Sequence, residues 1–272
     1  MLESNPNYLA FLEGLDPINK AQLLHGNWKV RATGNNYFKR ENLIEVDKLP
    51  NDIIWARGWD LASQEITTQN KDCDFSAGIK IGKDRNGFYY LVGDYHRDNY
   101  DELLCEYGRF RKRPAERDDI IANQGYQDGN DCVIVLPVDP GAAGKVAYQE
   151  LAKRLMSKHL RVRQDPMPTN KDKLTKFRPF TDAVEAGLVR IYTPSFDLKS
   201  KNSYFDELER FNGERSGRSV SAKDDRVDAT ATAFNYLVGA RNHKVVERNQ
   251  KKSTTLANNV LNEYDILLKN KR

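Results

Sequence analysis

IIWARGWDL, residues 53–61, is the first of three apolar segments that decide the fold, and FSAGIKIGK (75–83) and GFYYLVGDY (87–95) follow it. All three are rich in aromatic and β-branched residues, which favour strands. Asn86-Gly87, between the last two segments, is typical of a two-residue hairpin turn in which both turn residues have positive φ. The pattern therefore predicts three consecutive antiparallel strands.

After these strands the sequence alternates between helical and strand patterns. We expect helices at 98–123, 143–158, 171–186 and 224–240, and strands at 132–138, 161–164 and 188–192. An antiparallel set followed by such alternation indicates an α/β fold with a mixed sheet and helices on both faces.

Composition excludes several classes of protein. Charged residues make up 30% of the 272, the mean hydropathy is -0.74, and no run of about 20 apolar residues occurs, which excludes a membrane-spanning helix. The first residues show no secretory signal, so we expect a cytoplasmic protein. The three cysteines form no CxxC pair and the four histidines form no ligand-like pair. We therefore expect buried thiols and neither a zinc site nor Ser-His-Asp chemistry.

The chain divides into a lead-in segment (1–50), one domain (51–240) and a basic polar tail (241–272). Short helices are expected at 5–14 and 17–26 in the lead-in and at 256–268 in the tail. The tail holds eight basic and three acidic residues, so the net charge of +4 leaves the rest of the chain close to neutral. Global charge therefore does not identify a nucleic-acid binder, and clusters such as RFRKR (109–113) are more often a solvated helix face than a binding site.

Acidic residues occur at three positions where chemistry is expected. Asp60 ends an apolar strand, and Asp139 follows CVIVLPV, the most apolar strand, at the strand end where ligands gather in open sheets. The third position is KDDRVDA, at the start of the last helix. There Asp225 and Asp228 are three residues apart and share a helical face. Simpler roles stay open, since Asp60 could end the strand in water while Asp139 and Asp224 could cap helices.

Carboxylates on a first strand, a central strand and a last helix suit a hard cation such as Mg²⁺ or Mn²⁺. Two such ions, roughly 3.5–4 Å apart, can activate water and stabilise the leaving oxygen of a phosphodiester. PGAAGK (140–145) is no nucleotide-binding P-loop, because its glycines are too close together and Val146 replaces the Ser or Thr. The turn could still offer backbone N–H groups to a phosphate, with Lys145 nearby.

These motifs together resemble the nuclease domain of tailed-phage terminase large subunits. The resemblance is carried, in order, by RGWDLA, Asp74 ahead of FSAGI, VDPGAAGK, KDK (171–173), EAGLVRIY, YFDELERF and KDDRVDATATAFNYL. It covers about residues 55–237. It departs from the family at Pro137, where relatives often have an acid, and at Lys223, where they tend to have histidine.

The resemblance implies an RNase H-like fold and a metal-dependent endonuclease that cuts concatemeric viral DNA during packaging. It implies that Asp60, Asp139 and Asp225 are the catalytic, metal-binding triad, with Asp74, Asp224 and Asp228 as supporting ligands. The cofactors would be two Mg²⁺ or Mn²⁺ ions, and Asp60 would bridge them. The implied partners are double-stranded DNA, the small terminase subunit and the portal, in the host bacterial cytoplasm. No Walker A pattern occurs in the chain, so we expect no ATP hydrolysis.

Basic residues near these acids are candidates for DNA-backbone contacts. They are Lys145, the helical residues Lys171, Lys173, Lys176 and Arg178, and the residues Arg215, Arg218 and Lys223 ahead of the last helix. Two other functions stay open. One is a different RNase H-like nuclease, such as a junction resolvase or a hybrid-cleaving enzyme. The other is a non-catalytic DNA-binding module of the packaging machine.

Overall fold

The computed structural model describes residues 37–62, 67–68, 73–93, 105–168, 170–213 and 223–240. All of these belong to the first of two compact units, residues 1–240, and the second unit, residues 241–272, lies outside the described residues. The helices expected at 5–14, 17–26 and 256–268 also lie outside them. The division into lead-in, domain and tail therefore stays a prediction.

Within the described residues one mixed sheet forms the centre of the fold. Its strands are β1 (Ile44–Val46), β2 (Ile54–Asp60), β3 (Ser76–Lys83), β4 (Tyr89–Val92), β5 (Cys105–Glu106), β6 (Arg109–Phe110), β7 (Cys132–Leu136), β8 (Val162–Gln164) and β9 (Val189–Tyr192). They follow the order β1-β9-β4-β3-β2-β7-β8, and the β5–β6 hairpin pairs with β3. β2, β3 and β4 are antiparallel neighbours, whereas β7 pairs parallel to β2, and β9 pairs parallel to β4. This confirms the predicted mixed sheet.

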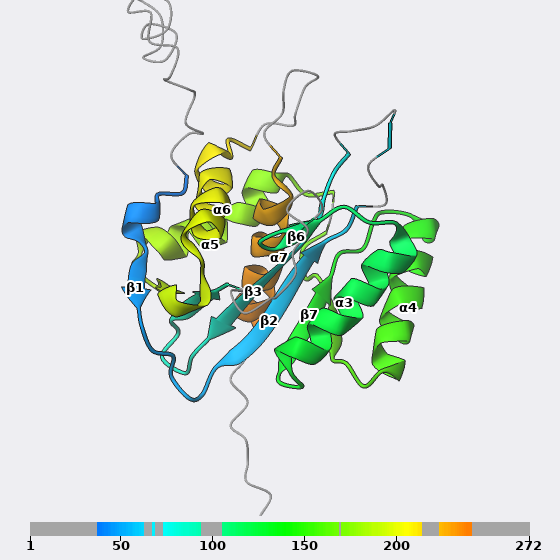
Figure 1. Ribbon diagram of the computed structural model, residues 1–272, viewed down its shortest axis with the longest axis horizontal. Helices are drawn as coiled ribbons and strands as arrows, with labels where there is room; N and C mark the ends of the chain where they lie inside the picture. Colours follow the sequence, from blue (N-terminus) through cyan, green and yellow to red (C-terminus); the bar gives the residue numbers. More distant parts are fainter. Residues whose placement is uncertain are drawn as a thin grey trace, which may run out of the picture. The chain divides into compact units, whose positions relative to one another are not determined.

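Helices cover both faces of this sheet (Figure 1). They are α3 (Pro114–Asp128), α4 (Ala142–Ser157), α5 (Lys173–Glu185), α6 (Leu198–Arg210) and α7 (Asp225–Gly239), with short 3₁₀ turns η2 (Arg40–Asn42) and η3 (Thr193–Ser195). One hydrophobic core joins the sheet to α5, α6 and α7, and a second joins it to α3 and α4. No helix in the described part of the chain has the length and apolar character needed to cross a bilayer.

Alternation along β2 sorts its side chains between these two cores. Ala56 belongs to the core beneath α7, and Trp59 belongs to the core beneath α3 and α4. Arg57 points the same way as Trp59, and its guanidinium binds Asp128 of α3. Asp60 is an even-numbered residue of this strand, so it lies on the side of α7.

Two local predictions are wrong. The helix expected at 98–123 begins only at Pro114, because Gly108, at φ 70°, turns the chain between β5 and β6, and Arg113 is extended ahead of the proline. The turn between β3 and β4 is longer than expected. Gly87 N donates to Asp84 O (3.3 Å) and Asp84 N to Phe88 O (3.0 Å), so Arg85, Asn86 and Gly87 form the loop and, of these three, only Gly87 has positive φ.

The structure also contains a strand and a helix that were not predicted, and it shows the surroundings of two cysteines. The sequence pattern predicts neither β1 nor α6, although both belong to the folded domain: β1 pairs with β9, and Tyr204, Phe205 and Leu208 of α6 are buried. Cys73 and Cys132 are buried free thiols, as expected. The side chain of Cys105 lies outside the described residues.

Candidate active site

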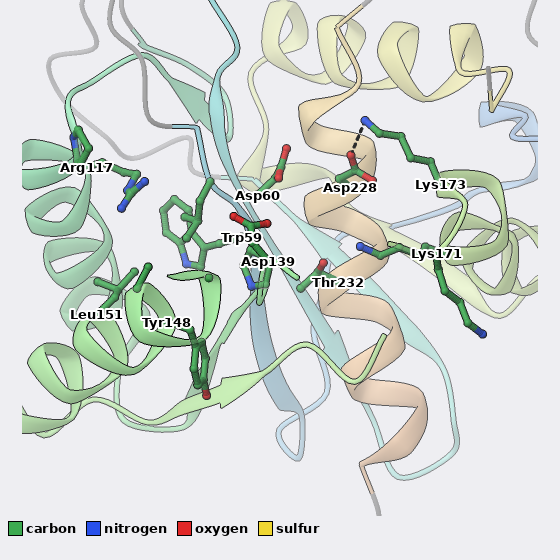
Figure 2. Close-up of a pocket in the computed structure, with 16 residues that line it drawn as sticks. Trp59, Asp60, Arg117, Asp139, Tyr148, Leu151, Lys171, Lys173, Asp228 and Thr232 are labelled. Carbon is green, nitrogen blue, oxygen red and sulfur yellow. Dashed lines mark ion pairs between the residues drawn. The ribbon is translucent and has the colours of Figure 1, made fainter. Parts of the chain in front are cut away.

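A cavity of about 500 Å³ opens where β2 and β7 end, between α7 and α4 (Figure 2). Three carboxylates line it, those of Asp60, Asp139 and Asp228. Four basic side chains line it as well, those of Arg117, Lys171, Lys173 and Lys176. Acids that are far apart in the sequence therefore meet in one place, together with basic side chains.

Asp60 and Asp228 are brought together by the close contact of β2 with α7. Gly58 makes this contact possible, because a Cβ at that position would lie 2.3 Å from the nitrogen of Ala233 and 2.4 Å from the carbonyl oxygen of Ala229. Burial raises the pKa of Asp60 well above its ordinary value, and the neighbouring carboxylates of Asp228 and Asp225 raise it further. This crowding of negative charge is what a divalent cation relieves.

The Lys173 ammonium lies among these acids. Its Nζ is 2.8 Å from Asp228 Oδ2 and 2.7 Å from Asp224 Oδ2. Burial opposes the charged form, but the carboxylates of Asp228 and Asp224 outweigh it and raise the pKa of Lys173. Burial also raises the pKa of Asp228, and Lys173 counteracts part of that effect. Lys173 is thus the cation that balances the acidic first turn of α7.

Asp139 lies in the loop that joins β7 to α4. The turn is held by Gly141, at φ 93°, and by Gly144, where a Cβ would lie 2.3 Å from the Asp139 carbonyl oxygen. α4 begins at Ala142 and receives no side-chain cap, since Gly141 is its N-cap residue. The carboxylate of Asp139 is exposed at the cavity, where it is free to bind an ion or a substrate group.

Asp225 lies beside the cavity but does not line it. Its Oδ1 accepts a hydrogen bond from Phe75 N (3.3 Å), while its buried Oδ2 has no hydrogen-bond partner among the described residues. Burial and the charges of Glu207, Asp74 and Asp224 raise the pKa of Asp225 to about 7. Of the two acids on one face of α7, the structure thus brings Asp228 into the cavity with Asp60 and Asp139.

The predicted supporting acids and basic residues have varied surroundings. Asp74 is exposed and binds Lys223 Nζ at 2.9 Å. Lys171 is exposed at the cavity, whereas Lys176 is buried, with its Nζ 3.5 Å from Asp165 Oδ2. Lys145 and Arg178 are exposed on α4 and α5. Arg215 and Arg218 lie outside the described residues, so the predicted DNA contacts are untested.

Arg117 also lines the cavity, although no sequence motif predicts it. It reaches from α3 to donate from Nη1 to the Ala62 carbonyl oxygen (3.1 Å), two residues beyond Asp60. Ser76 Oγ binds the same residue, since it accepts from Ala62 N (3.0 Å) and donates to Ala62 O (3.2 Å). The chain after Asp60 is thereby fixed. No local signal distinguishes Arg117 from other basic residues of a helix.

The residues fit a divalent metal by donor type. All acids at the cavity offer carboxylate oxygens, which Mg²⁺ and Mn²⁺ prefer. Burial raises the pKa of Asp60 and Asp228, neighbouring carboxylates raise that of Asp60 further, and the buried Oδ2 of Asp225 has no hydrogen-bond partner among the described residues. Within the described ranges, however, no three His, Cys, Asp or Glu side chains are close enough together to hold an ion in this arrangement. The donor set is present, and Lys173 provides its counter-charge.

One protein-family model matches the chain. The model of the terminase RNaseH-like domain matches residues 57–237. No curated protein sequence matches the chain. Among solved structures, the Thermus phage P74-26 large terminase nuclease domain is 15% identical, with a TM-score of 0.44 over 75% of this chain and 96% of that one.

Two further structures are similar at the same level. The large terminase nuclease from thermophilic phage G20c with bound zinc is 14% identical, with a TM-score of 0.41 over 71% of this chain and 94% of that one. The human cytomegalovirus terminase nuclease domain, soaked with Mn and with inhibitor bound, is 12% identical, with a TM-score of 0.41 over 69% of this chain and 82% of that one.

Proposed function

The chain belongs to the family of the terminase RNaseH-like domain, and we propose from this that it is a metal-dependent endonuclease that cuts double-stranded viral DNA during genome packaging. The observation that supports this activity most directly is the meeting of Asp60, Asp139 and Asp228 at one cavity beside basic side chains. Oxygen donors of this kind suit phosphodiester hydrolysis, which needs neither histidine nor cysteine.

In the proposed mechanism the acids at the cavity hold two divalent ions. When bound, Mg²⁺ or Mn²⁺ activates the attacking water and stabilises the leaving oxygen of the phosphodiester. Asp60, Asp139 and Asp228 would hold these ions through their carboxylate oxygens. Asp225 supports Asp228 from the same face of α7. The family resemblance implies the main role for Asp225, whereas Asp228 is the one of these two acids that lines the cavity.

The basic residues of the site bind the DNA backbone. Lys171 is exposed at the cavity and is the best situated of them to contact a phosphate next to the cut. Lys145 and Arg178, exposed on α4 and α5, extend this surface. Such contacts neutralise phosphates, so binding should weaken as salt rises and should depend little on sequence. The other partners we propose are the small terminase subunit and the portal, in the host bacterial cytoplasm.

Nicking of supercoiled plasmid in the presence of Mn²⁺ tests the activity. We expect Asp60→Asn, Asp139→Asn and Asp228→Asn each to lower cutting by about 100-fold or more, because each removes a charged ion ligand. Asp182→Asn is the matched control, because Asp182 is exposed on α5 and does not line the cavity. If all three cavity variants cut at the parental rate, the assignment is wrong. If Asp225→Asn abolishes cutting and Asp228→Asn does not, Asp225 is the third ligand.

The same assay separates the other functions considered. Preferential cutting of a four-way junction or of an RNA–DNA hybrid over plasmid would indicate a different RNase H-like nuclease. A purely DNA-binding module would leave plasmid intact with any divalent ion, and its melting temperature would not respond to Mn²⁺. A site of crowded acids should instead be stabilised by the ion.

A further inference from the structure

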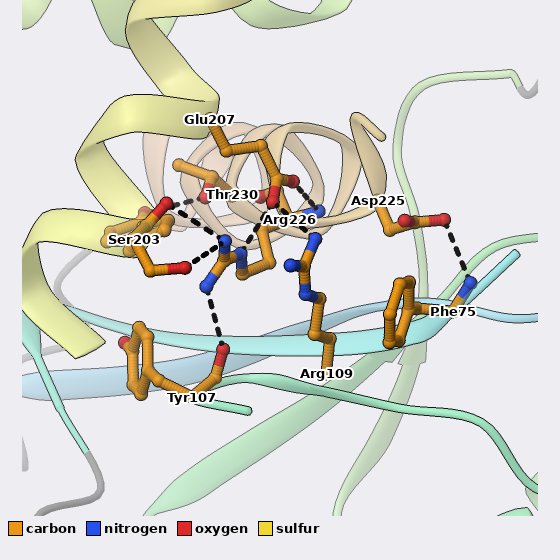
Figure 3. Close-up of polar contacts among 9 residues, drawn as sticks. Phe75, Tyr107, Arg109, Ser203, Glu207, Asp225, Arg226 and Thr230 are labelled. Carbon is orange, nitrogen blue, oxygen red and sulfur yellow. Dashed lines mark hydrogen bonds and ion pairs between the residues drawn. The ribbon is translucent and has the colours of Figure 1, made fainter. Parts of the chain in front are cut away.

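Glu207 of α6 is a buried carboxylate on which three donors converge (Figure 3). Its Oε1 accepts from the backbone N–H of Arg226 (2.7 Å), and its Oε2 accepts from Arg226 Nε (2.7 Å) and from Arg109 Nη1 (3.0 Å). Glu207 is only 7% exposed, and Arg226 only 1%. Glu207 does not line the cavity, so the proposed chemistry gives it no role.

The bond from Arg226 N to Glu207 caps the start of α7, because the N-cap residue of this helix makes no side-chain cap. The first N–H groups of a helix have no intrahelical partner and are normally satisfied by the N-cap side chain. The N-cap residue of α7, Asp224, makes no such bond, and its carboxylate binds Lys173 instead. Glu207 therefore supplies from another helix the acceptor that Asp224 does not provide.

The remaining bonds of Arg226 fix how α7 is turned about its axis. Its Nη1 donates to the Tyr107 carbonyl oxygen (3.2 Å), and its Nη2 donates to the carbonyl oxygen and Oγ of Ser203 (3.0 and 3.1 Å). Arg226 and Asp228 are two residues apart, which is about 200° around a helix. Holding Arg226 against α6 thus turns Asp228 to the opposite side, where Asp60 and the cavity lie.

We propose that Glu207 is a positioning residue for the metal site: it caps α7 from α6 and so holds Asp228 opposite Asp60. This inference rests on the proposed function, because it concerns the affinity of the same acids for a divalent ion. Glu207 does not touch the ion or the DNA. In this role the bond from Arg226 N positions the start of α7, while the charge of Glu207 neutralises Arg226 and Arg109.

Two variants of Glu207 distinguish the position of its acceptor oxygens from the negative charge of its carboxylate. Glu207→Gln keeps an oxygen that can accept from Arg226 N, but it removes the charge and places an amide NH2 where Arg226 Nε and Arg109 Nη1 now donate. Glu207→Asp keeps the charge and withdraws both oxygens by one methylene. The control is Asp128→Asn on the other face of the sheet. Asp128 is also buried and binds an arginine in two places, with Arg57 Nε at 2.5 Å and Nη2 at 3.0 Å.

The measurement is the Kd for Mn²⁺ by titration calorimetry, in metal-free protein, at a temperature where circular dichroism finds every variant folded. We expect Glu207→Asp to weaken Mn²⁺ binding about 10-fold or more, as is common for residues that orient ligands, and Glu207→Gln to stay within about threefold of the parent. Asp128→Asn should lower the melting temperature and leave the Kd unchanged. Glu207→Gln and Asp128→Asn each leave a buried arginine without its carboxylate and should lower the melting temperature, so the Kd is measured below the melting temperature of the least stable variant.

Three results would overturn the inference. One is a parental Kd in folded Glu207→Asp, which would make Glu207 a structural residue only. The second is weaker binding in Glu207→Gln than in Glu207→Asp, which would mean that charge decides. The third is equal weakening in Asp128→Asn, which would mean a general response to lost stability. If the parent chain itself binds no Mn²⁺, the proposed function fails, and the inference fails with it.

Discussion

Gly58→Ala adds one methyl group at the closest contact between β2 and α7. The new Cβ would lie 2.3 Å from Ala233 N, 2.4 Å from Ala229 O and 2.9 Å from Ala233 Cα, whereas ordinary van der Waals contact begins at 3.4 Å. All three partners are backbone atoms of a helix, so no side-chain rotation can relieve the clash. α7 must retreat from the strand by about 1 Å, or β2 must bend by a similar amount.

This displacement sets the expected magnitudes. Overpacking of a well-packed core costs about 1–3 kcal/mol, and we expect Gly58→Ala to lie at the upper end because both surfaces are backbone. Asp60 lies on β2 two residues after Gly58, and Asp228 lies on α7 next to Ala229, so their separation changes by the same amount. A misplacement of about 1 Å in a catalytic arrangement can cost about 100-fold in rate.

Urea unfolding gives the stability, and plasmid nicking with Mn²⁺, at a temperature where the variant is folded, gives the rate. Gly239→Ala is the control, because Gly239 is the last residue of α7 and a Cβ there would meet nothing within 4 Å. It should be neutral or stabilising by up to about 1 kcal/mol. A Gly58→Ala protein that is within about 0.5 kcal/mol of the parent and cuts at the parental rate would refute the close-contact argument.

Three further predictions follow from the charges and burial of single side chains. Lys173→Gln removes the ammonium that binds Asp224 and Asp228, so the metal-free protein should be less stable and the Kd for Mn²⁺ should fall; an unchanged or higher Kd in calorimetry would contradict this. The pKa of Asp225 is raised from 3.8 to about 7, so the native state holds a proton that the unfolded state releases, and this residue makes metal-free protein less stable as pH rises from about 4 to about 7. Urea unfolding should therefore give Asp225→Asn a free energy of unfolding that is higher, relative to the parent, at pH 8 than at pH 5. A difference between the two proteins that does not change with pH would count against the raised pKa of Asp225. Burial raises the pKa of the Cys132 thiol to about 12, so this thiol should react with a disulfide reagent only after unfolding, and rapid labelling of it in native protein, located by mass spectrometry, would contradict its burial.

Much of the fold could be predicted because its signals are local. The segments that became β2, β3 and β7 are apolar and bounded by turn residues. Helical periodicity predicts one apolar face of α7 from Val227, Ala231, Phe234 and Val238; the first three are buried, whereas Val238 is 51% exposed. The helix expected at 98–123 failed for a tertiary reason. Its residues Arg109 and Phe110 form β6, which makes a short hairpin with β5 and pairs with β3, and such pairing overrides local propensity.

The site was predictable only in outline. Asp60 and Asp139 stand out because each follows an apolar strand, and the carboxyl ends of neighbouring parallel strands meet at one edge of a sheet. The acids at the start of the last helix could also be predicted, because KDDRVDA stands directly ahead of a helical pattern. Neither Arg117 nor Glu207 could be recognised, because each acts through a contact with a segment far away in the chain, at Ala62 and at Arg226.

By itself, then, the sequence determined which elements form and which of them carry acids, since propensity, periodicity and strand ends are properties of neighbouring residues. Only the tertiary structure decided which acids meet. Asp225 and Asp228 share a face of α7 because they are three residues apart. The distance of α7 from β2 and its rotation about its own axis bring Asp228 into the cavity. The distance of α7 from β2 is set at Gly58, where the absence of a side chain allows the two backbones to touch. The rotation of α7 about its axis is set by the bonds that hold Arg226 against α6. Both are long-range contacts, whose partners no local pattern specifies.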